Sequence, residues 1–265
     1  MPDCAHPGRE RRRRRIQEAV VAADSLSMTT LSRRPRRRAR SALAAALALL
    51  ASLSAVTAAS EAVPANPLAR LRGGNDRFVK GTTAPVSAGP AARRALAAAG
   101  QPFAMVLSCA DARVPPEYVF DAGLGDLFVV RTAGAVVDKA VLASLEYGAA
   151  HLHVPLLVVM GHDACDVVKA AVAATPLEGP NLDYAARAIR TGTGRTPAEQ
   201  HELRAAILAN VEQVINDAMA GSVILREAAT AGRLQVVGAY HDSGTGRVIF
   251  SEPVGATTAP APAHK

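Results

Sequence analysis

The chain has 265 residues, a formal net charge of +7 and no tryptophan, but the positive charge is distributed unevenly. Residues 1–62 contain 12 arginines and five acidic residues, whereas residues 63–265 contain 18 basic and 18 acidic residues. A protein that binds nucleic acid carries its basic patch on the folded domain. The neutral balance of residues 63–265 therefore argues against that class and predicts no nucleic-acid partner.

The first 62 residues predict export. An arginine-rich segment at 33–40 precedes an alanine- and leucine-rich run at 42–51, and small residues follow, as in a signal peptide. We interpret residues 28–62 as that signal, starting at Met28, and residues 1–27 as a basic preface that is either untranslated or disordered. The alternative is an uncleaved anchor, because the apolar stretch approaches the roughly 18 residues that span a bilayer. Export predicts a periplasmic or extracellular protein that meets the membrane only through its signal.

Residues 63–252 are numerous enough to form one core-containing domain. The remaining residues, 253–265, are rich in alanine, proline and threonine and are predicted to be disordered. Two helices are predicted at 66–81 and 91–99, ahead of any strand. Helices in that place are candidates for packing on a partner subunit.

Four short, continuous apolar runs predict strands that are covered on both faces: 103–108, 127–131, 154–160 and 234–239. Helical segments are predicted at 139–150, 164–174, 199–220 and 223–231. This alternation predicts an α/β fold with a mostly parallel sheet flanked by helices. Residues 247–251 are predicted to pair with the last strand as an edge hairpin, and residues 179–196 to form a surface loop.

Two motifs carry the chemistry: Cys109-Ala-Asp111-Ala-Arg113, and Gly-His162-Asp-Ala-Cys165. They follow the first and third apolar runs, and parallel strands bring such positions to the same edge of a sheet. Two cysteines and one histidine form a zinc ligand set that leaves the fourth position open. Water at an open position on zinc is a source of hydroxide near neutral pH. A disulfide between the two cysteines is the alternative in an oxidising compartment, but it leaves His162 without a role.

Asp111 and Arg113 alternate with Cys109, and residues two apart in an extended segment share a face. We expect the Asp111 carboxylate to orient the zinc-bound hydroxide, and Arg113 to hold that carboxylate in a bidentate pair. The other histidines and aspartates near these motifs are not expected to bind the metal. We expect exposed positions for His151, His153 and His241, helix-capping positions for Asp163 and Asp166, and no role for His201.

Over residues 67–250, these motifs resemble the β-class carbonic anhydrases of bacteria. The segments that carry the resemblance are 75–78, 109–117, 120–131, 133–134, 144–147, 161–162, Cys165, 237–240 and 246–248. The resemblance implies one Zn²⁺ per subunit, held by Cys109, His162 and Cys165, and a catalytic dyad of Asp111 and Arg113. It also implies a homodimer or homotetramer with apolar clefts near the subunit interface, and CO₂ and bicarbonate as the small-molecule partners.

The expected reaction is the reversible hydration of CO₂ to bicarbonate and a proton by zinc-bound hydroxide. Two alternatives remain: hydrolysis of CS₂ or COS on the same zinc site, and a zinc-binding protein without turnover. The chain departs from the family pattern at Asp166, where glycine is usual, and at Ala135, where many relatives have asparagine. Neither departure removes a ligand, but we expect the charge of Asp166 to slow the enzyme near neutral pH. Because the chain has no tryptophan, we expect no allosteric control by bicarbonate.

Overall fold

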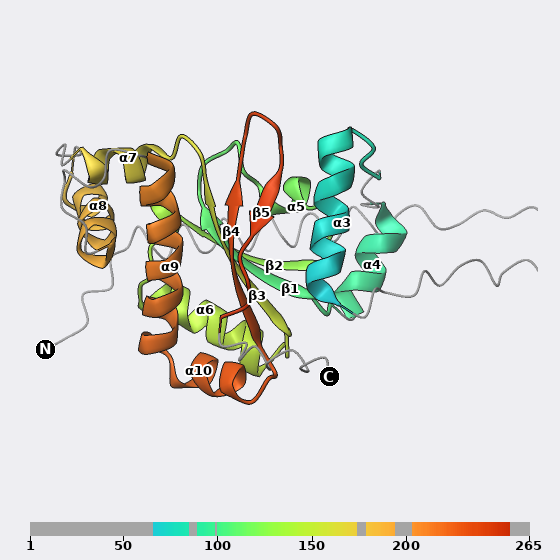
Figure 1. Cartoon of the computed structure of the whole chain (residues 1–265). Coiled ribbons are helices and arrows are strands. Elements are labelled where there is room, and N and C mark those ends of the chain that lie inside the picture. The colour runs from blue at the N-terminus through green and yellow to red at the C-terminus, as the bar shows by residue number, and fades with distance from the viewer. Residues whose placement is uncertain (1–65, 85–88, 99, 174–178, 194–202, 255–265) are drawn as a thin grey trace, which may run out of the picture. The chain divides into compact units, whose positions relative to one another are not determined.

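The computed structural model describes residues 66–84, 89–98, 100–173, 179–193 and 203–254 (Figure 1). All of them belong to one compact unit, Glu61–Lys265. The predicted preface, the predicted signal peptide and residues 255–265 of the predicted tail lie outside the described ranges. Among the helices in those ranges, none combines the length and the apolar character needed to traverse a bilayer.

The centre of this unit is a five-stranded sheet with the order β2-β1-β3-β4-β5. The first four strands in the chain pair in parallel, and β5 pairs antiparallel with β4. The mostly parallel sheet and the final hairpin are therefore confirmed. The strands are β1 Ala104–Cys109, β2 Leu127–Thr132, β3 Leu156–His162, β4 Gln235–His241 and β5 Val248–Phe250.

Helices cover both faces of the sheet, with α3 on one side and α9 on the other (Figure 1). Side chains such as Leu71 of α3 pack against Val158 of β3 on one face. On the other face, Ile215 of α9 packs with Leu107 of β1 and Val159 of β3. The helices are α3 Pro67–Lys80, α4 Pro90–Ala98, α5 Pro116–Val119, α6 Lys139–Ala150, α7 Asp166–Val172, α8 Pro180–Thr193, α9 Leu203–Gly221 and α10 Val223–Thr230.

The prediction of a surface loop at 179–196 is wrong, because residues 180–193 form helix α8. One face of α8 is small and apolar, with Ala185, Ala186 and Ile189 buried. On the same helix, Asp183 pairs with Arg187 one turn later, which supports a helix. The threonine and glycine content of the segment concealed this pattern. Residues 199–202 of the helix predicted at 199–220 lie outside the described ranges.

The strand order places a topological switch point between β1 and β3. After β1 the chain crosses to β2 on one side, and it then returns to form β3 on the other side of β1. In open α/β sheets, ligands bind beyond the carboxyl ends of the strands at such a point. Cys109 is the last residue of β1 and His162 is the last residue of β3, so the topology brings the two predicted motifs together.

Candidate metal centre

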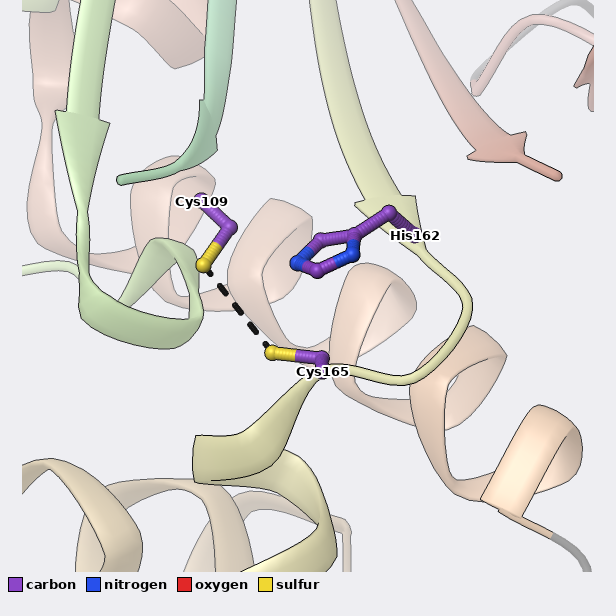
Figure 2. A group of neighbouring side chains, drawn as sticks. All are labelled: Cys109, His162 and Cys165. Atoms are coloured by element: carbon purple, nitrogen blue, oxygen red, sulfur yellow. Dashed lines mark hydrogen bonds between the residues drawn. The ribbon is translucent and has the colours of Figure 1, made fainter. Parts of the chain in front are cut away.

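Three predicted ligands converge at the switch point, as Figure 2 shows. Cys109 ends β1, His162 ends β3, and Cys165 is the N-cap residue of α7. The ligand atoms of these three side chains lie within 4.8 Å of one another, and all three residues are buried. Buried ligands from three different elements are held by the fold, which favours a preformed metal site.

The donor atoms have the arrangement that zinc requires. The Sγ atoms of Cys109 and Cys165 are 3.9 Å apart, close to the ~3.8 Å expected for two sulfurs about 2.3 Å from one tetrahedral zinc. Both cysteines are free, and a disulfide would need its sulfurs at about 2.05 Å. The geometry therefore fits a metal ion and does not show the alternative disulfide.

The imidazole of His162 presents its Nε2 atom to the same centre. Its Nδ1 atom lies 2.7 Å from the carbonyl oxygen of Asp163. A carbonyl only accepts, so Nδ1 carries the proton and Nε2 keeps a free lone pair. Nε2 is buried and has no hydrogen-bond partner. A buried nitrogen without a partner is costly in an empty pocket but is what a metal ligand provides.

The surroundings of the two sulfur atoms favour a thiolate at Cys109 and a neutral thiol at Cys165. The Cys165 thiol, and to a lesser extent His162 and the backbone N–H groups of Gly134 and Asp111, together lower the pKa of Cys109 to about 4 although burial opposes them. Contact with Cys109, together with burial, raises the pKa of Cys165. Burial lowers the pKa of His162, but Cys109, the Asp163 carbonyl and Asp111 together outweigh burial and the net shift is upward. One negative charge is thus already stabilised between the two sulfurs, and a cation in the centre would stabilise the second.

Asp111 and Arg113 form the predicted bidentate pair beside Cys109. Arg113 Nε donates to Asp111 Oδ1 at 2.9 Å, and Arg113 Nη2 donates to Asp111 Oδ2 at 2.6 Å. The bond from Arg113 holds the pKa of Asp111 well below its usual range, so the carboxylate remains ionised at physiological pH. Arg113 Nη2 also donates to the carbonyl oxygen of Ala164, at 3.1 Å. The dyad therefore connects the two segments that carry the cysteines.

The pair between Asp111 and Arg113 was predicted from an extended backbone, and that reason is only partly right. We expected residues 109–113 to be extended, but the strand ends at Cys109 and residues 112 and 113 form a turn. The Asp111 carboxylate accepts from the backbone N–H of Arg113 at 2.9 Å, as an aspartate does when it initiates a turn. The turn, and not an extended strand, brings the guanidinium back onto the carboxylate.

Two further predictions are wrong. His241 was expected to be exposed, but it ends β4 opposite His162 in the sheet register and is 2% exposed. Asp163 and Asp166 were expected to cap α7, but the N-cap residue is Cys165 and no side chain accepts there. Asp163 instead accepts from the backbone N–H and the hydroxyl of Ser243, at 2.8 and 2.5 Å. This contact ties the loop after β3 to the turn after β4.

Three further histidines were considered in the sequence, and none is a candidate metal ligand within the described residues. His151 and His153 are exposed as predicted, and His201 lies outside the described ranges.

Two residues that the sequence did not single out support the centre. Arg131 of β2 donates to the carbonyl oxygens of Cys109 and Asp111. Asn210 of α9 is buried and donates from its amide to the carbonyl oxygen of Gly134 at 2.9 Å. Both bond to backbone carbonyls, which leave no signature in a sequence. A polar residue within an otherwise apolar strand or helix face was the only available signal.

Comparisons with known proteins agree with this geometry. The sequence profile of the family described as carbonic anhydrase matches residues 104–248. Carbonic anhydrase 2 of Mycobacterium tuberculosis is 39% identical over 202 residues, which cover 72% of this chain and 95% of that protein. A carbonic anhydrase of Mycolicibacterium smegmatis is 51% identical over 113 residues, covering 42% of this chain and 55% of that protein.

Solved structures identify the class. One of two tetrameric β-carbonic anhydrases from the fungus Sordaria macrospora superposes with a TM-score of 0.56 at 27% identity, covering 63% of this chain and 87% of that one. A Coccomyxa β-carbonic anhydrase has the same TM-score at 23% identity, covering 82% and 89%, and shows the shared fold. The chain belongs to the β-carbonic anhydrase family. Carbonic anhydrase activity, the interconversion of CO₂ and bicarbonate, is the enzyme function that this membership carries.

Proposed function

We propose that Cys109, His162 and Cys165 hold one Zn²⁺ ion, and that Asp111 and Arg113 serve CO₂ hydration at that centre. The observation that carries the proposal is the convergence of two sulfurs and an unpartnered Nε2 within 4.8 Å. Bound zinc supplies a Lewis acid, with an open position where water becomes acidic enough to act near neutral pH. The protein's own side chains determine how that chemistry is directed.

The Asp111 carboxylate is suited to orient a water molecule in the site. Its Oδ1 accepts two hydrogen bonds from Arg113 and its Oδ2 accepts one. A carboxylate oxygen can accept more than one hydrogen bond, so Oδ2 retains room for a water proton. Because Arg113 keeps the group ionised, Asp111 acts only as an acceptor. It therefore fixes which way the water's proton points and leaves an oxygen lone pair directed at CO₂.

The residues beneath the centre favour an uncharged substrate. Val114 and Val136 are buried in the same apolar cluster as Cys109 and Cys165. CO₂ is small and carries no charge, so apolar surroundings of this kind suit it better than they suit an ion. Asp166 is exposed at the start of α7, so solvent screens its charge. The slowing effect expected of Asp166 should therefore be small.

Three statements about the whole protein complete the proposal. We propose a homo-oligomer, a dimer or a tetramer, in which α4 and the exposed side of α3 lie on a partner subunit, while the buried side of α3 covers its own sheet. The Sordaria relatives are described as tetrameric, and apolar side chains such as Tyr118 and Tyr147 are 71% and 51% exposed here. We propose export by residues 28–62, from the charge and hydropathy pattern of that segment alone. The predicted location is periplasmic or extracellular.

The test is stopped-flow CO₂ hydration by zinc-loaded protein, with zinc content measured on the same samples. Cys109→Ser and His162→Ala should lose both zinc and activity. Asp111→Ala should retain zinc and lose about 10- to 100-fold in rate, as when an outer contact of a metal site is removed. Asp183→Ala is the matched control, because it breaks another Asp–Arg pair, on α8, and should leave the rate unchanged.

Each part of the proposal can fail separately. A zinc-loaded wild type that does not hydrate CO₂ would contradict the reaction on this site. Full activity in Asp111→Ala would contradict the orienting role, and full zinc content in His162→Ala would contradict the ligand assignment.

A further inference from the structure

Arg131 reaches from the edge strand into the motif that carries the dyad. It lies on β2 opposite Ser108 of β1. Its Nε donates to the carbonyl oxygen of Cys109 at 2.9 Å, and its Nη2 donates to the carbonyl oxygen of Asp111 at 2.5 Å. One guanidinium thus holds the carbonyl of the last residue of β1 and a carbonyl of the segment that follows the strand.

These two bonds restrict the backbone between Cys109 and Asp111, from which the dyad carboxylate projects. After Cys109 the only sheet-like contact that continues is from the N–H of Ala110 to the carbonyl oxygen of Thr132, at 3.0 Å. The carbonyls on both sides of Ala110 are then held by Arg131. The next backbone bond, from the N–H of Val114 to the carbonyl oxygen of Asp111 at 3.2 Å, closes the turn. The carbonyl of Asp111 is therefore shared between the turn and Arg131.

The guanidinium is well suited to this task. Its planar fork presents several N–H groups at fixed angles, so two bonds formed together define an orientation and not merely a distance. Hydrogen bonds from a charged donor are also stronger than those from a neutral one. The direction of the Asp111 side chain follows from its own backbone, so a fixed backbone fixes the carboxylate before Arg113 engages it.

We propose that Arg131 is a positioning residue for CO₂ hydration, acting through Asp111. Its hydrogen bonds go to the carbonyl oxygens of Cys109 and Asp111, in the backbone from which one ligand and the dyad carboxylate project. A continuous path then runs from Arg131 through Asp111 and Arg113 to the carbonyl of Ala164, next to Cys165. The inference rests on the proposed role of Asp111, and its test separates the two.

The variants are Arg131→Met, which keeps the length and removes the charge, and Arg131→Lys, which keeps the charge and removes the fork. Arg226→Met is the matched control, because Arg226 also donates to a backbone carbonyl, that of Met219 at 2.8 Å, but on α10. In zinc-loaded full chain, Arg131→Met should lower kcat by about 10- to 100-fold, as misplacement of a catalytic group does. KM should change less than about twofold, Arg131→Lys should recover part of the loss, and Arg226→Met should match wild type.

Amide hydrogen exchange gives a readout that does not depend on activity. In Arg131→Met, exchange should become at least about tenfold faster at the N–H groups of Ala110, Arg113 and Val114, because their partners lose the constraint. The control variant should leave those amides unchanged. Far-UV circular dichroism shows whether the variant is folded, and if Arg131→Met does not fold, the same comparisons are made with Arg131→Lys.

The double variant of Asp111→Ala with Arg131→Met tests whether Arg131 affects turnover through Asp111. If Arg131 acts through Asp111, the double variant should be no slower than Asp111→Ala alone, since the group to be positioned is absent. Losses that multiply would overturn the proposal and place the effect on Cys109. Unchanged amide protection in Arg131→Met would overturn it whatever the activity. A zinc-loaded wild type without CO₂ turnover would instead defeat the proposed function.

Discussion

The loop between His162 and Cys165 contains a strained residue that can be tested by one substitution. Ala164 has a φ of 50°, in the left-handed region, because only two residues separate the end of β3 from the N-cap of α7. An alanine there costs about 1–2 kcal/mol relative to the ordinary helical region. Ala164 is exposed, so its methyl group contributes little packing. Ala164→Gly should relieve the strain while adding about 0.4–1 kcal/mol of chain entropy to the unfolded state. We expect a net gain of about 0.5–1 kcal/mol.

The control is an exposed alanine in an ordinary helix. Ala143 is exposed midway along α6, and Ala143→Gly should cost about 1 kcal/mol, so the two identical substitutions should differ in sign. Urea unfolding followed by circular dichroism measures both, at one protein concentration and one zinc occupancy because binding and assembly shift apparent stability. If Ala164→Gly destabilises the protein as much as Ala143→Gly does, left-handed strain at this loop is refuted.

Two further predictions concern the core around the site. His241 is buried with both ring nitrogens unpartnered, and burial lowers its pKa. Its stabilising contribution is therefore present above the unfolded pKa of about 6.5 and lost as pH falls toward the folded value. His241→Met should reduce the loss of melting temperature between pH 7.5 and 5.5, and an unchanged loss would contradict this. In Gly161→Ala, the new Cβ would lie 2.7 Å from Ile207 Cγ2, which should cost about 1–3 kcal/mol in urea unfolding. Gly89→Ala, with nothing within 4 Å, should be nearly neutral, and equal effects would refute the clash.

The sequence predicted the sheet because the sheet is covered on both faces. β1 is buried at every position, so it appears as an unbroken apolar run, and β3 and β4 are similar. The convergence of the three candidate metal ligands was predictable for a related reason. Positions at the ends of parallel strands are close in space whatever their separation in sequence, so two motifs 53 residues apart, counted from Cys109 to His162, could be placed together.

The errors came where tertiary contacts outweigh local pattern. His241 stands beside a polar turn and seemed exposed, but pairing with β3 on one side and β5 on the other buries it. Asp163 had the composition of a cap, but Ser243 reaches it from the turn after β4. The prediction of a loop at 179–196 failed because the glycines and threonines of that segment drew attention away from its buried face of two alanines and one isoleucine.

Different contacts hold the three proposed ligands in place. These differences predict which substitutions should disturb zinc binding. Cys109 is fixed by strand pairing and by the bond from Arg131 to its carbonyl. His162 is fixed by strand pairing and by its bond to the Asp163 carbonyl. Cys165 lies after a strained turn and has only the first turn of α7 to hold it. The bond from Arg113 to Ala164 supplies the missing restraint there. In the proposed centre Arg113 therefore has two tasks, to direct a carboxylate and to steady the least constrained of the three proposed ligands. Its loss should affect zinc retention as well as turnover, unlike that of Asp111.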